Sequence, residues 1–195
     1  MPVRETKLAF LDTETTGLVP GQDEVIEVAT ILTDLELREV ARFEAKTQTT
    51  KPPSAAAAAV NGWDAEVWKR EAVPFERWSA WLRSHLPFGE VAVAVGANPQ
   101  FDRAIIDAAY YKPRSSFFPI SYRVVDVCAF GTAMRAGGIL PLADSKLTTL
   151  AAAIGHPHVA HRAMGDCEAA LAVFRHVIGL MRAGMGGAEP RAGKP

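Results

Sequence analysis

The chain has 195 residues, of which 49% are hydrophobic and 22% charged, a balance typical of one globular domain with a sizeable core. Its 21 basic residues nearly match its 22 acidic ones, so the net charge of −1 excludes a globally basic nucleic-acid-binding surface. Two cysteines, Cys128 and Cys167, are too few for a disulfide framework, which fits the reducing cytoplasm. We find neither a signal peptide nor an apolar run of about 18 residues, so we expect a cytoplasmic protein without a membrane partner.

The N-terminal half of the chain predicts three strands followed by helices. Apolar and β-branched runs at 7–13, 24–34 and 38–48 are typical of strands, and the short link between the last two favours a hairpin. Residues 51–63 predict a proline-led loop and a short helix that ends at an Asn-Gly cap pair. Residues 74–86 place large apolar side chains at helical spacing behind a proline, so they predict an amphipathic helix.

The C-terminal half alternates strands with helices. The continuous apolar run at 91–98 predicts a strand that is buried on both faces, and a helix is expected after it at 100–111. Residues 122–130 predict a strand that runs into a helix, which should stop at a pair of glycines. Two further helices are expected at 145–155, closed by a glycine, and at 165–184, where a long apolar stripe is clear.

The order of these elements predicts the fold class. Three strands that can pair antiparallel, followed by strands alternating with helices, favour an α/β fold with a mixed sheet in three layers. We expect one domain over residues 1–182. The Gly- and Pro-rich residues 183–195 are expected to form a disordered C-terminal tail.

The stretch AFLDTETTGL carries two carboxylates at the end of an otherwise apolar strand. Because strand side chains alternate between faces, Asp12 and Glu14 should share one face while Thr13 points to the other. Two like charges there repel each other, and burial of an unpaired charge is costly. Hard divalent cations bind carboxylate oxygens, and Mg²⁺ typically uses one or two carboxylates together with substrate phosphate and water. The pair therefore indicates a metal site.

Two further acids and a histidine can complete such a site. Asp102 begins a helix just after the buried strand, and Asp166 follows His161 by five residues at a loop-to-helix junction. Each also has a simpler explanation, since acids are favoured in the first turn of a helix and a lone histidine is often a surface residue. Two metal ions that clamp the attacking and leaving oxygens of a phosphoryl displacement require several converging acids and a base, which this sequence provides.

Three histidines, His156, His158 and His161, lie within six residues. They suggest zinc, but their spacing matches no helical pair of ligands and no cysteines accompany them. We therefore do not favour a zinc site, and we expect His156 and His158 to be loop residues without a catalytic role.

Three motifs, DTETTG, NPQFD and HRAMGD, occur in this order. They resemble the three exonuclease motifs of the DEDDh family, the RNase H-like 3′–5′ exonucleases that include the proofreading subunit of bacterial DNA polymerase III and ribonuclease T. The resemblance covers roughly residues 7–180 and extends to the segments VIEVA, VNGW and KLTTLAAAIG. It implies an RNase H-like three-layer fold with a mixed five-stranded sheet.

The resemblance also implies a two-metal site for Mg²⁺ or Mn²⁺ and assigns its residues. His161 matches the general base, because it precedes the last Asp by five residues; the sister subclass has Tyr at the position of Arg162. Small departures from the family pattern are Ala97, where many members have His, and Gly165 and Cys167 beside the last Asp. The residues that match the metal ligands and catalytic acids are Asp12, Glu14, Asp102 and Asp166.

The activity that the resemblance implies is metal-dependent hydrolysis of phosphodiester bonds from the 3′ end of single-stranded nucleic acid, which releases nucleoside 5′-monophosphates. Single-stranded DNA is the favoured substrate, with proofreading and a polymerase partner as possible contexts. Alternatives are an exoribonuclease of the ribonuclease T or oligoribonuclease kind, a catalytically silent nucleic-acid-binding module, and another two-metal hydrolase such as a phosphatase. Phe101 can also be a core residue. The candidate substrate contacts are Thr15, Thr16, Gly17, Asn98 and Phe101.

Overall fold

The computed structural model describes residues 4–110 and 119–185, and its strands form one mixed sheet. The strand order is β3–β2–β1–β4–β5; β2 pairs antiparallel with β1 and β3, whereas β4 pairs parallel with β1 and β5. This arrangement confirms the predicted fold class. The strands are β1 (Arg4–Thr15), β2 (Val25–Thr33), β3 (Glu39–Lys46), β4 (Glu90–Gly96) and β5 (Ile120–Asp126).

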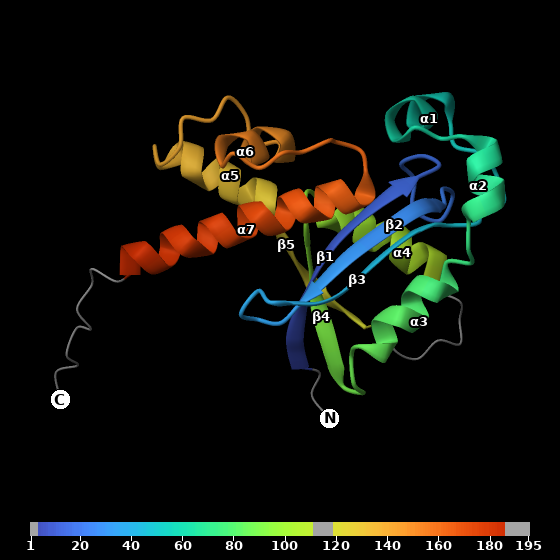
Figure 1. The fold of residues 1–195 in the computed structure, drawn as a ribbon, viewed down its shortest axis with the longest axis horizontal. Helices are drawn as coiled ribbons and strands as arrows, with labels where there is room; N and C mark the ends of the chain where they lie inside the picture. The colour runs from blue at the N-terminus through green and yellow to red at the C-terminus, as the bar shows by residue number, and fades with distance from the viewer. Residues whose placement is uncertain (1–3, 111–118, 186–195) are drawn as a thin grey trace.

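Helices cover both faces of the sheet and one of its ends (Figure 1). One face packs against α5, α6 and α7, and the other packs against α3 and α4, so the molecule has three layers. The helices are α1 (Ala55–Asn61), α2 (Ala65–Glu71), α3 (Glu76–Ser84), α4 (Pro99–Tyr110), α5 (Val127–Ala136), α6 (Leu147–Ala153) and α7 (Ala163–Met185).

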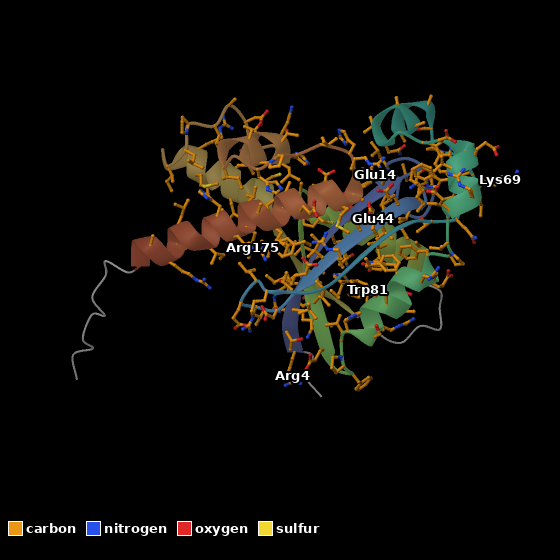
Figure 2. The ribbon with its side chains drawn as sticks, in the orientation of Figure 1. Arg4, Glu14, Glu44, Lys69, Trp81 and Arg175 are labelled. Atoms are coloured by element: carbon orange, nitrogen blue, oxygen red, sulfur yellow. The ribbon has the colours of Figure 1, made fainter. Side chains whose placement is uncertain are left out.

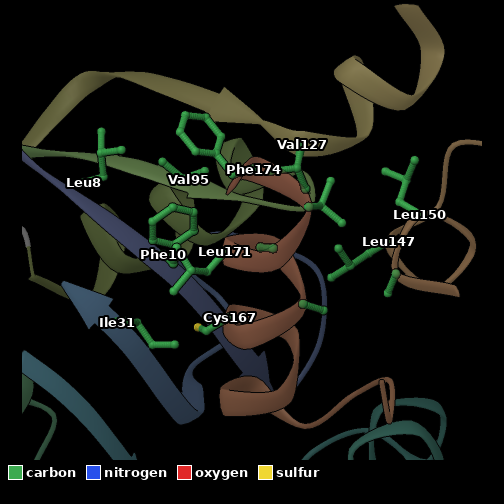
Figure 3. Packing of buried hydrophobic residues seen from close by; sticks show 14 of the residues in the cluster. Leu8, Phe10, Ile31, Val95, Val127, Leu147, Leu150, Cys167, Leu171 and Phe174 are labelled. Atoms are coloured by element: carbon green, nitrogen blue, oxygen red, sulfur yellow. The ribbon is translucent and has the colours of Figure 1, made fainter. Parts of the chain in front are cut away.

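Strand β1 contributes to both halves of the core because its side chains alternate. Leu8 and Phe10 belong to the cluster under α7, where Phe10 meets Phe174 edge to face with ring centroids 5.7 Å apart (Figure 3). Ala9 and Leu11 belong to the cluster under α3 and α4. Asp12 and Glu14 continue the row of Leu8 and Phe10, so this alternation directs them to the α7 face.

Most predicted elements are present, with small shifts at their ends. Helix α2 was not predicted; it begins after Asp64, whose side chain accepts hydrogen bonds from the N–H groups of Glu66 and Val67. The short helix α1 ends, as expected, at Gly62, which has φ 68° and closes it as a left-handed C-cap. Helix α7 continues to Met185, beyond the expected domain end at 182. The rest of the expected tail, 186–195, lies outside the described residues.

The carboxyl ends of β1, β4 and β5 meet at one edge of the sheet, where α1 and the start of α7 also lie (Figure 1). In sheets with parallel strands this edge is the usual place for a ligand site. Gly96 ends β4 here, and a Cβ at this position would lie 2.8 Å from the carbonyl oxygen of Leu11, so a side chain would separate the two strands. Within the described ranges, no helix is suited to cross a membrane, and Cys128 and Cys167 are free thiols.

Candidate active site

Three of the four predicted acids converge at this edge. Carboxylate oxygens of Asp12, Glu14 and Asp166 lie within 4.8 Å of one another. The first two come from the end of β1, and the third comes from the first turn of α7, which packs on the same face of the sheet. Figure 2 shows Glu14 at this end, whereas Arg4 lies at the opposite end of the same strand.

The electrostatics of this cluster favour a cation. Burial raises the pKa of Asp12 well above its ordinary value, and the negative charges of Asp102 and Asp166 raise it further. Burial, together with the charge of Asp166, raises the pKa of Glu14 to about 7. A divalent ion among these groups would relieve both effects, and a set of carboxylate oxygens is the donor set that Mg²⁺ and Mn²⁺ prefer. The residues present therefore fit the expected metal.

Asp102, the fourth acid, reaches the edge from α4 on the opposite face. It is buried, and its Oδ1 accepts hydrogen bonds from the backbone N–H of Thr13 at 2.8 Å and from the Thr13 hydroxyl at 2.7 Å. Burial raises its pKa to about 7, although the two bonds from Thr13 act in the opposite direction. Asp102 is close enough to Asp12 to affect its pKa but lies outside the cluster of three carboxylates.

A cavity of about 640 Å³ opens beside the acids. It is lined by the end of β1, the turn that follows, one side of α1, Phe101 and His161. Phe101 also packs partly against the core under α3 and α4, so it is both a core residue and a cavity wall. Leu18 and Val60, each more than half exposed, add apolar surface. The predicted contacts that line this cavity are Thr15, Thr16, Gly17 and Phe101.

The turn after β1 is organised by Asp23, which the sequence analysis did not single out. The Asp23 carboxylate accepts hydrogen bonds from the Thr16 hydroxyl at 3.0 Å and from the N–H of Val19 at 2.9 Å. It also pairs with Lys51 at 2.8 Å. A Cβ on Gly17 would lie 2.5 Å from an Asp23 carboxylate oxygen, so this form of the turn requires glycine. The loop from 18 to 23 is thereby held against the cavity.

Asn98 has a structural position and does not line the cavity. Its backbone is in the left-handed region, with φ 58°, and its N–H donates to Asp126 Oδ1 at 3.3 Å. The same Asp126 oxygen caps α5 by accepting from the N–H of Cys128 at 2.9 Å. This arrangement sets the direction in which α4 begins, and Asp102 in its first turn thereby reaches Thr13. Asn98, a predicted substrate contact, is therefore not among the residues that line the cavity.

His161 lies on the segment between α6 and α7, and its side chain lines the cavity. The residue is exposed and has φ 62°, a left-handed conformation that is uncommon outside glycine. Next to it, Glu27 of β2 is buried and accepts a hydrogen bond from the backbone N–H of Ala163, the first residue of α7. Burial raises the pKa of Glu27, whereas the charge of Arg162 lowers it. Glu27 thus anchors the end of the segment that carries His161.

His158 lies in the loop after α6, as expected. Its side chain is only 4% exposed, and Nε2 lies 2.8 Å from Asp166 Oδ1. Its Nδ1 is buried and has no hydrogen-bond partner. The side chain of His158 therefore contacts Asp166, one of the three clustered acids. His156, two residues earlier, is half-buried in the same loop.

Comparisons with known proteins identify an exonuclease family and solved structures of similar fold. A family model described as Exonuclease (RNase_T) matches residues 9–174. A comparison with curated protein sequences finds no match. Among solved structures, E. coli exonuclease I in complex with a dT13 oligonucleotide has a TM-score of 0.74 and 20% identity, with 93% of this chain and 43% of that chain covered.

Other structures of exonuclease I give the same result. The zinc-bound E. coli exonuclease I–ssDNA complex has a TM-score of 0.73 and 20% identity, with 92% of this chain and 42% of that chain covered. The structure of SSB/exonuclease I with an inhibitor has a TM-score of 0.71 and 20% identity, with 90% and 42% covered. The chain thus spans less than half the length of these proteins, and at this identity the likeness shows a shared fold.

Proposed function

Because the chain belongs to the DEDDh exonuclease family and has its RNase H-like fold, we propose that it removes nucleotides from the 3′ end of single-stranded DNA. The family match and the mixed five-stranded sheet confirm the family and the fold that the three motifs predict. The observation that carries the proposal is the convergence of Asp12, Glu14 and Asp166 beside a cavity that His161 lines.

We propose that Asp12, Glu14 and Asp166 hold one divalent ion and that Asp12 and Asp102 share a second. Bound there, Mg²⁺ or Mn²⁺ would activate the attacking water and stabilise the charge on the leaving oxygen. The buried position of Asp12 between the other acids supports its assignment to both ions. Thr13 would hold Asp102 against this centre through its two hydrogen bonds.

His161 is the proposed general base. Water attacks the phosphorus of the terminal phosphodiester, the bond to the 3′ oxygen breaks, and the departing oxygen takes up a proton to become the new 3′-hydroxyl group. The proton of the water passes to His161, and imidazole suits this role because it exchanges protons near neutral pH. The residue is exposed at the cavity wall, so it can return the proton to solvent.

The cavity also supports a substrate with unpaired terminal bases. Its walls are largely apolar, with Leu18, Val60 and Phe101 available to contact a base, and the backbone of the turn is available to a sugar or phosphate. The oligonucleotide complexes of the structurally similar exonuclease I favour DNA. A preference for RNA over DNA would require a contact to the 2′-hydroxyl group. A polymerase partner, proofreading and a cytoplasmic location remain predictions from the sequence.

The test of this function is digestion of end-labelled DNA and RNA strands of one sequence with Mg²⁺, Mn²⁺ or EDTA. We expect mononucleotides to be released from the 3′ end only with metal, and faster from DNA. Faster release from RNA would favour an exoribonuclease, and release of none would indicate a silent binding module.

The ligand assignment has its own test. The Asp12→Asn variant should lose activity and bind Mn²⁺ more weakly in calorimetry while it stays folded. If its Mn²⁺ affinity equals that of the wild type, the assignment of Asp12 is wrong.

A further inference from the structure

The buried side chain of His158 has one nitrogen without a hydrogen bond, so its burial costs free energy that another contact must offset. Its side chain is 4% exposed, and Nδ1 has no partner, which costs free energy because a buried polar atom without a hydrogen bond has lost its contact with water. The compensating contact is between Nε2 and Asp166 Oδ1, at 2.8 Å. Because an ionised carboxylate can only accept, Nε2 is the donor in this contact, and Nδ1 is the nitrogen without a partner.

The loop is built so that His158 reaches Asp166. Gly155, with φ 71°, follows the end of α6, and the segment after it contacts the first turn of α7 through His158 and Val159. The carbonyl oxygen of Val159 comes so close to that turn that a Cβ on Gly165 would lie 3.2 Å from it. Glycine at 165, a departure from the family pattern, thus permits the close approach that positions the histidine.

We propose that His158 positions Asp166 for metal binding. The imidazole donates to Oδ1, and the backbone N–H of Arg162 donates to Oδ2 at 3.2 Å, so both oxygens of the carboxylate are oriented by donors. A carboxylate held in this way would present its remaining lone pairs to an ion shared with Asp12 and Glu14, whose carboxylate oxygens lie within 4.8 Å of it. The inference rests on the proposed function, because it needs a divalent ion bound by these three acids.

The geometry assigns His158 an indirect role. Among the described residues, the group of atoms close enough to share an ion consists of three carboxylates and includes no histidine. His158 also does not line the substrate cavity, in contrast to His161. It can therefore act on the ion only through Asp166, and residues that orient a ligand in this way typically contribute about 10- to 100-fold to metal affinity.

Two amide variants separate positioning from simple packing. In His158→Gln the amide nitrogen is as many bonds from Cα as Nε2, so it can still donate to Asp166. In His158→Asn the amide nitrogen is one bond shorter and corresponds to Nδ1, so the bond is lost although the side chain is equally polar. His156→Asn, in the same loop, is the matched control.

The measurement is calorimetry of Mn²⁺ and Mg²⁺ binding to each variant of the full chain, with the melting temperature in EDTA recorded in parallel. We expect His158→Asn to lose about 10- to 100-fold in affinity for both ions, and His158→Gln and His156→Asn to stay near the wild type. A wild type that binds neither ion would contradict the proposed function itself and not only the role of His158.

Three other outcomes would overturn the role of His158. Unchanged affinity in His158→Asn means that the contact is only structural. Higher affinity in that variant means that the imidazole competes with the ion for Asp166. A loss for Mn²⁺ without a loss for Mg²⁺ means that His158 is itself a ligand, because nitrogen ligands favour Mn²⁺ over Mg²⁺.

Discussion

Asp102 and Thr13 are joined by two hydrogen bonds to one carboxylate oxygen, from the backbone N–H at 2.8 Å and from the hydroxyl at 2.7 Å. Thr13 lies between Asp12 and Glu14 on β1, with its side chain on the opposite face of the sheet. These bonds therefore connect α4 to the strand that carries two of the clustered acids. Thr13, which lies between the two acids of the DTETTG motif, thus holds Asp102, the acid of the NPQFD motif, in place.

We predict that Thr13→Val lowers the free energy of unfolding by about 1–3 kcal/mol, because it removes a hydroxyl donor from a buried carboxyl group. Loss of this donor should also raise the pKa of Asp102 further, since the Thr13 bond lowers it in the native protein. Thr13→Ser, which keeps the hydroxyl, is the control. Urea unfolding in EDTA measures the difference. Equal stability of the Val and Ser variants would show that the hydroxyl contributes little.

The strands and most helices could be predicted because their signals are local. β-Branched runs, prolines at helix starts and the Asn61–Gly62 cap each act within a few residues. Helix α2 was missed because its seven residues bury only Trp68 and show little periodicity. Its one clear signal is Asp64, which is a good N-cap residue.

The site could be predicted only as far as its motifs extend. The four acids and His161 lie in three short sequence motifs, and the structure brings three of the acids together. The supporting residues depend on tertiary contacts: Thr13 and Asp102 are 89 positions apart in the sequence. No local pattern encodes such a pairing. Thr13 and Glu27 were missed for this reason. Asp23 and His158 contact residues only four to eight positions away, but their sequence surroundings do not show which residue they contact.

The turn after β1 provides a second prediction. In Gly17→Ala the new methyl group would lie 2.5 Å from the Asp23 carboxylate, so Asp23 must move away from Thr16 and Val19. We expect weaker substrate binding, measured as a higher KM for a short DNA strand, with a smaller change in kcat. Gly21→Ala, in the same loop, is a useful comparison because a Cβ there meets no atom within 4 Å, although φ 80° strains it. A KM unchanged by Gly17→Ala would remove the turn from the substrate site.

The buried acids predict how stability depends on pH without metal. Glu14 and Asp102 have pKa values raised to about 7 from 4.5 and 3.8, and the pKa of Asp12 is raised well above 3.8. The folded state therefore binds more protons than the unfolded state over this range, so stability falls as pH rises from about 4 to 7. In EDTA the melting temperature should be lower at about pH 8 than at about pH 5.

Two further melting curves check this explanation. Mn²⁺ should raise the melting temperature most at the higher pH, where the acids are ionised. Asp12→Asn in EDTA should show a weaker pH dependence than the wild type, because one of the repelling charges is absent. A metal-free protein that becomes more stable between about pH 5 and pH 8 would contradict the direction of these shifts.

The last prediction concerns His161, which lines the cavity but does not belong to the carboxylate cluster. His161→Ala should lose roughly 10²- to 10⁴-fold in kcat, the usual contribution of a general base, while its Mn²⁺ affinity stays unchanged. His158→Asn should differ on both counts, because its defect lies in metal binding and excess Mn²⁺ should restore its activity. If excess Mn²⁺ also restored His161→Ala, the base would have to be sought elsewhere.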